Sequence, residues 1–106
     1  MFMSDTTIYR ADILKALAQP TRLKIIDFLR NGEKCVCEIF PAIAEEQSNT
    51  SRHLNLMQAS GILERRKDGV KIFYSIKHQE VLDIVDLAGC IVKHEIIGRQ
   101  MLLAVV

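Results

Sequence analysis

The chain has 106 residues, of which 49% are hydrophobic and 25% are charged. This length and composition fit one domain, residues 1–106, and argue against a disordered protein. No run of about 18 uncharged apolar residues is present, so a membrane-spanning helix is excluded. Basic residues exceed acidic ones by only one overall, but residues 47–77 hold six basic and two acidic side chains, a local net charge of 6 − 2 = +4. The positive charge is therefore concentrated in one segment.

The chain contains three cysteines, an odd number, and no apolar run follows a basic start. This pattern differs from a secreted disulfide framework, so we expect reduced thiols and a cytoplasmic protein. Two of the cysteines, Cys35 and Cys37, are separated by one residue in "EKCVCEIF". In the cytoplasm, close cysteines more often serve metal or redox chemistry than structural bridges.

The first part of the chain predicts three helices after a loose start at residues 1–7. Apolar residues at helical spacing indicate a first helix from about residue 8 to 17. A second helix begins near Pro20 and stops at the Asn31-Gly32 pair. A shorter third helix runs from about Val36 to Ala44, and Pro41 bends or shortens it.

The segment "QSNTSRHLNLMQASG" predicts a fourth helix that is closed by Gly61. At about 100° per residue it has a polar face with Ser48, Arg52 and Asn55 and an anchoring face with Thr50, Leu54 and Met57. The following segment, "ILERRKDGVKIFYSI", alternates strand-like residues around Asp68-Gly69. It predicts a basic β-hairpin with strands at about 62–66 and 71–76.

The final helix, at residues 78–100, is apolar on nearly every side. Such a helix must be buried on more than one side, and the rest of a small domain covers only one of them. We therefore expect the other side to pack against a second copy of the chain, which makes this segment a dimerisation helix and the protein a homodimer.

The elements in this order predict a winged helix-turn-helix fold: mainly α with a β-hairpin, in the order α-α-α-α-β-β-α. The fourth helix is narrow enough to enter the major groove of DNA, where its polar side chains, including Asn55, can pair with base edges. The hairpin would place its basic side chains against phosphates or the neighbouring minor groove; these are Arg65, Arg66, Lys67 and Lys71. The alternative is a solvated surface helix with ordinary solubilising charges.

Four segments in this order and spacing, "LKALAQPTRLKIIDFL", "CVCEI", "QSNTSRHLNLMQASGIL" and "RRKDGVKIFYSI", resemble the ArsR/SmtB family of metal-responsive repressors. The resemblance covers about residues 8–100. It implies a homodimer that binds double-stranded operator DNA with an inverted repeat and leaves it when an inducer binds. By matching position, it also implies which residues lie at or near the DNA: Gln47, Ser48, Asn49, Ser51, Arg52 and His53.

The resemblance extends to "CVCEI", which is similar to the C-x-C through which arsenic- and cadmium-sensing members bind soft metals. Thiolates favour As(III), Cd(II), Pb(II) or Zn(II), and As(III) is the inducer we expect first. Arsenic-sensing members often have a third cysteine three residues after the second, where this chain has Phe40. A three-coordinate ion would therefore need Cys90, a water or a small thiol as its third ligand.

Other interpretations of these residues stay open at this point. Cys90 is interpreted first as a small residue in the dimer interface and second as a metal ligand. The C-x-C pair also suits a thiol-based redox regulator with the same DNA surface, and a dimeric interaction module without specific DNA binding is a further alternative. We do not expect an enzyme, because the chain has no phosphate-binding glycine loop and no recognisable catalytic carboxylate pair or triad. We also expect no organic cofactor and no membrane partner.

Overall fold

A computed structural model describes residues 5–105 of the chain. The first helix, α1, spans Thr6–Leu17 and therefore includes two residues that were expected to be loose, whereas residues 1–4 lie outside the described part. The second helix, α2 (Pro20–Phe28), begins as predicted, with Pro20 in its first turn and the Gln19 side chain accepting a hydrogen bond from the backbone N–H of Arg22 at 2.9 Å. Proline suits this position because the first turn does not need its missing N–H.

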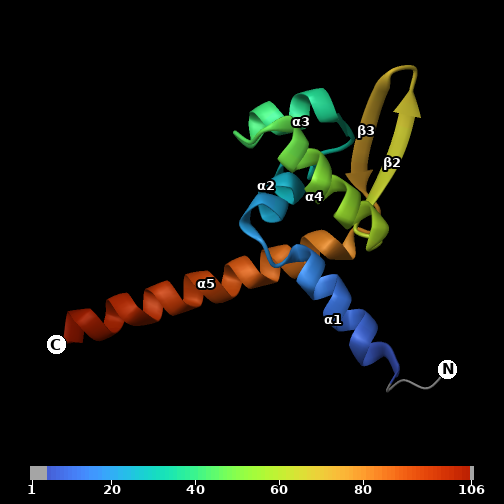
Figure 1. The fold of residues 1–106 in the computed structure, drawn as a ribbon. Coiled ribbons are helices and arrows are strands. Elements are labelled where there is room, and N and C mark those ends of the chain that lie inside the picture. The colour runs from blue at the N-terminus through green and yellow to red at the C-terminus, as the bar shows by residue number, and fades with distance from the viewer. Residues whose placement is uncertain (1–4, 106) are drawn as a thin grey trace.

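The remaining elements follow in the predicted order, with one addition. A two-residue strand, β1 (Lys34–Cys35), precedes α3 (Val36–Ala42), and α4 spans Gln47–Ala59. The hairpin strands are β2 (Leu63–Asp68) and β3 (Lys71–Ile76), and α5 runs from Glu80 to Val105. Figure 1 shows α2, α3 and α4 packed together beside the hairpin, with α5 extending away from this body.

The sheet has the strand order β1-β3-β2, and all of its pairs are antiparallel. Asp68 pairs with Lys71, so the turn consists of Gly69 and Val70 rather than being centred on Asp68-Gly69. Gly69 has φ = +62°, a left-handed conformation that glycine adopts without the steric cost of a Cβ atom. The hairpin projects from the body as the wing of a winged helix-turn-helix (Figure 1).

The hydrophobic core lies between α2, α3, α4 and the base of the hairpin. Its fully buried side chains come from each of these elements: Ile25, Ile26, Leu29, Ile39, Leu54, Met57, Ile62 and Leu63. This core fixes α4 by one face and leaves the opposite face exposed. Among the described residues, no helix is long and apolar enough to cross a membrane.

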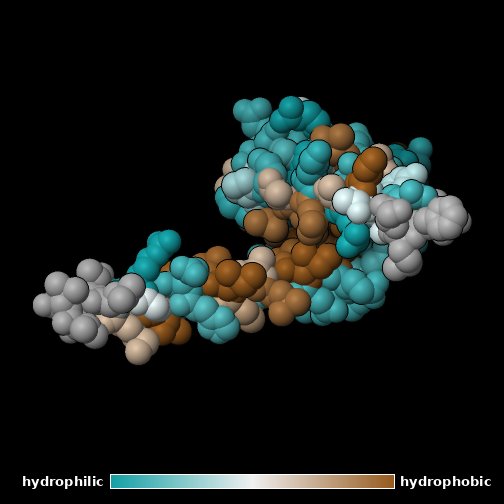
Figure 2. Space-filling view, turned by 90° about the horizontal axis from the view of Figure 1, so that it is seen from below, coloured by the Kyte–Doolittle hydropathy of each residue, from teal (hydrophilic) through white to brown (hydrophobic). Residues whose placement is uncertain are grey.

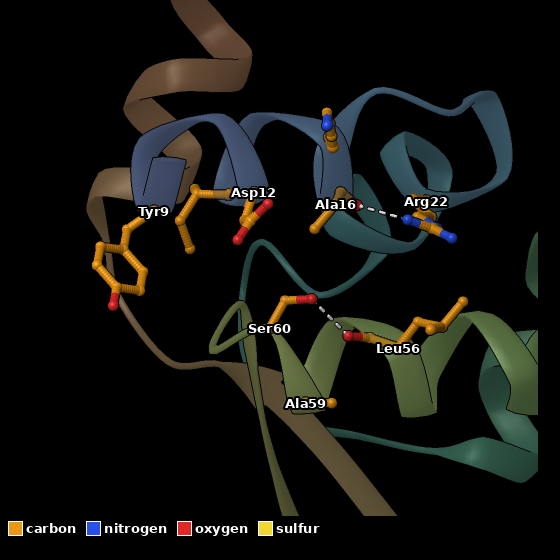
Figure 3. A pocket seen from close by; sticks show the side chains of 9 residues that line it. Tyr9, Asp12, Ala16, Arg22, Leu56, Ala59 and Ser60 are labelled. Carbon is orange, nitrogen blue, oxygen red and sulfur yellow. Dashed lines mark hydrogen bonds between the residues drawn. The ribbon is translucent and has the colours of Figure 1, made fainter. Parts of the chain in front are cut away.

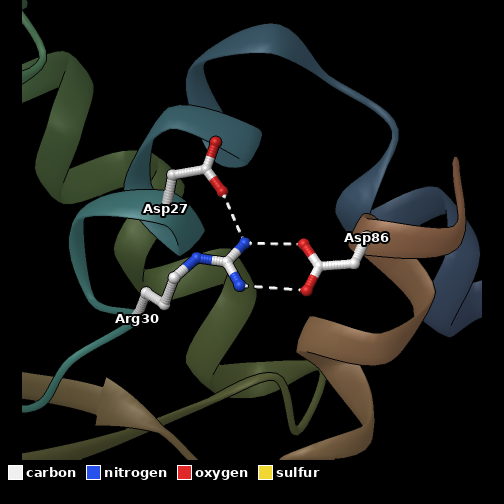
Figure 4. Close-up of polar contacts among 3 residues, drawn as sticks. All are labelled: Asp27, Arg30 and Asp86. Atoms are coloured by element: carbon white, nitrogen blue, oxygen red, sulfur yellow. Dashed lines mark hydrogen bonds and ion pairs between the residues drawn. The ribbon is translucent and has the colours of Figure 1, made fainter. Parts of the chain in front are cut away.

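The long helix α5 joins the core only near its start, where Val81 and Leu82 are buried. Further along it, large apolar side chains are about half exposed or more: Leu87, Ile91, Val92, Ile96, Ile97 and Met101. Figure 2 shows apolar side chains along α5 that continue onto the underside of the body. An ion pair between Arg30, in the turn after α2, and Asp86 on α5 fastens the helix to the body (Figure 4).

Candidate nucleic-acid interface and cysteine pair

The helix α4 presents its polar side chains on one broad side, away from the core. Thr50, Leu54 and Met57 are buried against the core, as the helical periodicity predicted. Ser48 and Arg52 are exposed on the outward face. A helix with one anchored face and an exposed polar face has the form needed to enter a major groove.

The part of this polar surface that lies nearest the wing borders a cavity. Gln47, Ser51 and Asn55 are spaced four residues apart and line a cavity of about 500 Å³ between α3, α4 and the wing. The hydroxyl of Tyr74 on β3 donates a hydrogen bond to the side-chain oxygen of Asn55 at 3.2 Å. The predicted DNA-contacting residues of α4 therefore divide into an outward set and a cavity-lining set.

Hydrogen bonds hold the start of α4 in place. The side-chain amide of Asn49 donates to Glu45 at 3.0 Å and accepts from the guanidinium of Arg52 at 2.6 Å. Glu45 also accepts a bond from the hydroxyl of Thr21 on α2 at 3.5 Å. Arg52 is thereby oriented before any partner arrives, which lowers the entropy that its ordering would cost on binding.

His53 does not face outward, although the resemblance implied a position at or near the DNA. It is only 6% exposed, and its Nδ1 atom accepts a hydrogen bond from Nε of Arg22 on α2 at 3.1 Å. Burial lowers the pKa of His53 below its usual value, and the nearby cations of Arg22 and Arg52 lower it further. The neutral imidazole is thus a hydrogen-bond acceptor that joins α4 to α2.

Arg22 links three helices, a role that the sequence did not reveal. Besides its bond to His53, it donates to the backbone carbonyl of Ala16 at 3.3 Å (Figure 3). Beside this contact, a hollow of about 540 Å³ separates α1 from the end of α4, with Tyr9 on one side and Leu56 on the other (Figure 3). No local signal indicated this role, because Arg22 and His53 are 31 positions apart.

The basic side chains of the wing are not equivalent. Arg65, Lys67 and Lys71 are exposed. Arg66, which was expected to contact phosphates, instead donates two hydrogen bonds to Glu33, at 2.9 and 2.6 Å, and its guanidinium lies 4.6 Å from the centre of the Phe73 ring. The cation lowers the pKa of Glu33. Arg66 therefore already has an anionic partner within the chain.

The two neighbouring cysteines converge at the start of α3. Cys35 caps the helix in an extended conformation, and its Sγ atom accepts a hydrogen bond from the backbone N–H of Cys37 at 3.2 Å. Its own backbone N–H donates to Glu38 at 3.1 Å. The Cα atoms of the pair are 5.1 Å apart, within the usual disulfide range, and the sulfurs are joined as a disulfide. This corrects the expectation that all three cysteines are free thiols.

The third cysteine lies elsewhere. Cys90 is free and exposed on α5. Among the described residues, no group of three or more cysteine, histidine, aspartate or glutamate side chains is placed to hold a metal ion. Within one chain the predicted ligands Cys35 and Cys37 are therefore brought together, and Cys90 does not join them.

Comparison with known proteins identifies the family of this chain. Residues 19–65 match the model of a family described as bacterial regulatory protein, arsR family. An uncharacterized HTH-type transcriptional regulator of Methanocaldococcus jannaschii is 41% identical over 73% of this chain and 88% of its own length. The chain belongs to the arsR family. The resemblance inferred from its motifs is thereby confirmed.

Other arsR-family similarities concern metal resistance and the dimeric fold. A probable mercury resistance operon repressor of Streptomyces lividans is 38% identical over 82% of this chain and 67% of its own length. An arsenical resistance operon repressor of Staphylococcus xylosus is 32% identical over 77% of this chain and 86% of its own length. A homodimeric winged helix-turn-helix DNA-binding domain of Mycobacterium bovis has a TM-score of 0.78 and 27% identity, and the match covers 88% of this chain and 86% of that domain. The predicted winged-helix fold and a role in transcriptional regulation rather than enzymatic catalysis are confirmed.

Proposed function

We propose that this chain is a homodimeric repressor of transcription that holds operator DNA with α4 and the wing and releases it when a soft metal or metalloid binds at Cys35 and Cys37. The observation that carries this proposal is the cavity between α3, α4 and the wing, because one wall holds the cysteine pair and the others belong to the DNA-reading elements. As a regulator of this kind it would work in the cytoplasm, as one domain.

The DNA-binding part of the proposal rests on charge and shape. Ser48 and Arg52 face outward from α4, while Arg65, Lys67 and Lys71 are exposed on the wing. Arginine and serine side chains on a helix suit base edges and phosphates, and lysine side chains on a wing suit the DNA backbone. Gln47, Ser51 and Asn55 would contribute from the side of the cavity, and Asn49 by orienting Arg52.

Dimerisation would use α5. Its exposed apolar side chains form a surface that a single chain leaves in contact with water, and burying such a surface against a second copy is favourable. Two copies joined in this way would present two α4 helices to successive major grooves, which corresponds to an inverted-repeat operator. The homodimeric domain of Mycobacterium bovis supports a dimer of this fold.

The metal-binding part rests on the donor atoms. The sulfurs of Cys35 and Cys37 converge, and after reduction both would be available as soft ligands. The relatives associated with mercury and arsenical resistance support a thiophilic ion, of which As(III) is our first choice, with Cd(II), Pb(II) and Zn(II) as alternatives. Two sulfurs do not complete a three-coordinate site, so the third ligand would come from a small thiol, a water or Cys90.

Release of DNA would follow from linkage between the two sites. An ion that binds the α3 cysteines better in one arrangement of α3, α4 and the wing shifts the dimer toward that arrangement. If the arrangement no longer fits the operator, a coupling free energy of about 2 kcal/mol changes DNA affinity about 30-fold. The contacts of α3 with both α4 and the hairpin provide the physical connection.

The experiment is a titration of the reduced protein on its operator with As(III), followed by fluorescence anisotropy. Release is expected in the wild type and is expected to be lost in Cys35→Ser and Cys37→Ser. Cys90→Ser is the comparison that shows whether the third cysteine takes part. If Cys35→Ser still releases DNA with As(III), the sensing proposal fails; if the wild type binds DNA only weakly and without sequence preference, the interaction-module alternative replaces it.

The disulfide between Cys35 and Cys37 favours a second function, that of a redox sensor. In this reaction two thiols and hydrogen peroxide give the disulfide and two molecules of water, so the sulfurs are oxidised and the peroxide is reduced. Peroxide treatment without metal would then change operator affinity in the wild type but not in Cys37→Ser. A change of affinity with As(III) but not with peroxide would exclude this second function.

A further inference from the structure

The cavity beside the cysteine pair carries an unbalanced positive charge. Arg65 on β2 and Lys71 on β3 both line it, and none of the described residues that line it is acidic. Asp68 lies opposite Lys71 in the strand pairing, but among the described residues neither Arg65 nor Lys71 forms an ion pair with a carboxylate within 4.0 Å, whereas their neighbour Arg66 is paired with Glu33. An open cleft bordered by two cations without ion-pair partners favours an anionic occupant.

The remaining walls suit a small polar molecule. Gln47, Ser51 and Asn55 supply hydrogen-bonding groups from α4, and Phe40 and Ile72 supply apolar surface. Pockets that bind small molecules combine a mainly apolar lining with a few polar groups that fix the orientation of the ligand. The volume of about 500 Å³ lies within the range of such pockets.

The cysteine pair adds a reactive group to this cavity. Cys37 is exposed, whereas Cys35 is only 4% exposed. A nucleophile in the cavity therefore reaches the Sγ atom of Cys37 more easily than that of Cys35. Thiolates are the nucleophiles that react with disulfides.

We propose that this cavity binds a small anionic thiol and delivers its sulfur to Cys37. The incoming thiolate forms a bond to Sγ of Cys37, the bond between the two cysteine sulfurs breaks, and the electron pair stays on Sγ of Cys35. That sulfur becomes a thiolate, so one disulfide is exchanged for another and no external oxidant or reductant is consumed. The inference rests on the proposed sensing role of Cys35 and Cys37 and names the class of molecule that opens the pair.

Three two-carbon thiols that differ in charge test the proposal: 2-mercaptoethanesulfonate, 2-mercaptoethanol and cysteamine. The protein is first oxidised mildly, and peptide mapping verifies the bond between Cys35 and Cys37. Each rate constant is expressed per concentration of thiolate and relative to that of the same thiol with a small reference disulfide, because the three thiols differ in pKa and therefore also in nucleophilicity. We expect the thiolate that carries a sulfonate to react about tenfold faster than the one that carries an ammonium group, with the mixed disulfide on Cys37.

Matched variants separate binding in the cavity from the general charge of the wing. In the double variant Arg65→Gln, Lys71→Gln the preference is expected to fall to about twofold, whereas Lys67→Gln, which alters a wing cation outside the cavity, keeps most of it. The proposal fails if the three thiols have equal rate constants, or if Lys67→Gln lowers the preference for the sulfonate thiol as much as the double variant does. It also fails if the adduct forms on Cys35 or if no bond joins the two cysteines after oxidation. The reaction is followed without metal and without DNA, so its failure is distinguishable from a failure of As(III)-dependent DNA release.

Discussion

The guanidinium of Arg30, in the turn after α2, holds both carboxylate oxygens of Asp86 on α5, at 3.0 and 2.8 Å (Figure 4). The same guanidinium contacts Asp27 on α2 at 3.1 Å. The cation lowers the pKa of Asp86, so the carboxylate stays ionised. Because α5 is the proposed dimerisation helix, this pair connects the dimer surface with the body that holds α4.

Replacing Asp86 by asparagine is expected to weaken operator binding without unfolding the chain. Exposed ion pairs contribute little to folding stability, but the loss of this one frees the angle between α5 and the body. We expect operator affinity to fall about fivefold while the thermal midpoint of unfolding changes little. Asp27→Asn is the matched control, since it removes a carboxylate from the same arginine without altering α5. An equal loss of affinity in both variants would contradict the linking role.

Folding stability is expected to fall as the pH decreases below about 6.5 because of His53. In the unfolded chain the imidazole takes up a proton near its ordinary pKa of 6.5, whereas the folded state keeps it neutral to lower pH. The unfolded state therefore binds more protons in this window, and lower pH favours unfolding. Urea denaturation between pH 7 and pH 5 measures the effect. His53→Asn retains an acceptor for Arg22 and should show a shallower decline; the same slope as in the wild type would rule His53 out as its cause.

Arg52→Ala tests whether the outward face of α4 reads DNA. If Arg52 pairs with a base edge, the variant loses about 1–3 kcal/mol of binding free energy, and the loss is larger on the operator than on unrelated DNA. If it contacts only phosphate, affinity falls equally on both DNAs and the salt slope decreases by about 1. Anisotropy at several salt concentrations distinguishes the two results. Arg10→Ala, on α1, is the control, and an unchanged affinity in Arg52→Ala would remove α4 from the interface.

Glu33→Gln tests the pairing of Arg66 with Glu33. The substitution removes a negative charge beside the wing and frees a cation, so we expect higher affinity for DNA and a steeper dependence on salt. The gain should disappear in the double variant Glu33→Gln, Arg66→Gln. Binding to nonspecific duplex DNA is the suitable measurement, because the effect is electrostatic and independent of sequence. A gain that persists in the double variant would show that Arg66 is not the cation released.

The order of helices and strands was predictable because its signals are local. Pro20 starts α2, Gly69 closes the hairpin, and apolar periodicity marks the buried face of α4. The strand β1 was missed because its two residues become a strand only by pairing with β3, opposite Tyr74 and Phe73. A pairing between segments nearly 40 residues apart leaves no local pattern.

The site was predictable where a helix or a cap determines the geometry and not where distant side chains meet. The burial of His53 could have been predicted, since His53 lies three residues after the buried Thr50 and four before the buried Met57. The convergence of Cys35 and Cys37 follows from the extended cap residue. The pairing of Arg66 with Glu33 could not be predicted, because Glu33 lies 33 positions away and the sequence offers several other acidic residues that could pair with an arginine.

A charged residue in the exposed apolar part of α5 is expected to separate the proposed dimer. Ile91 is 64% exposed, and burying such a side chain between two copies contributes about 1.5–3 kcal/mol for each copy. Ile91→Glu should therefore be a folded monomer in size-exclusion chromatography with light scattering, with helical circular dichroism retained and operator affinity lost. Val70→Glu is the control for the oligomeric state alone, because Val70 is also apolar and 97% exposed but lies at the tip of the wing. If Ile91→Glu remains a dimer at micromolar concentration, the two copies are joined by a surface other than this part of α5.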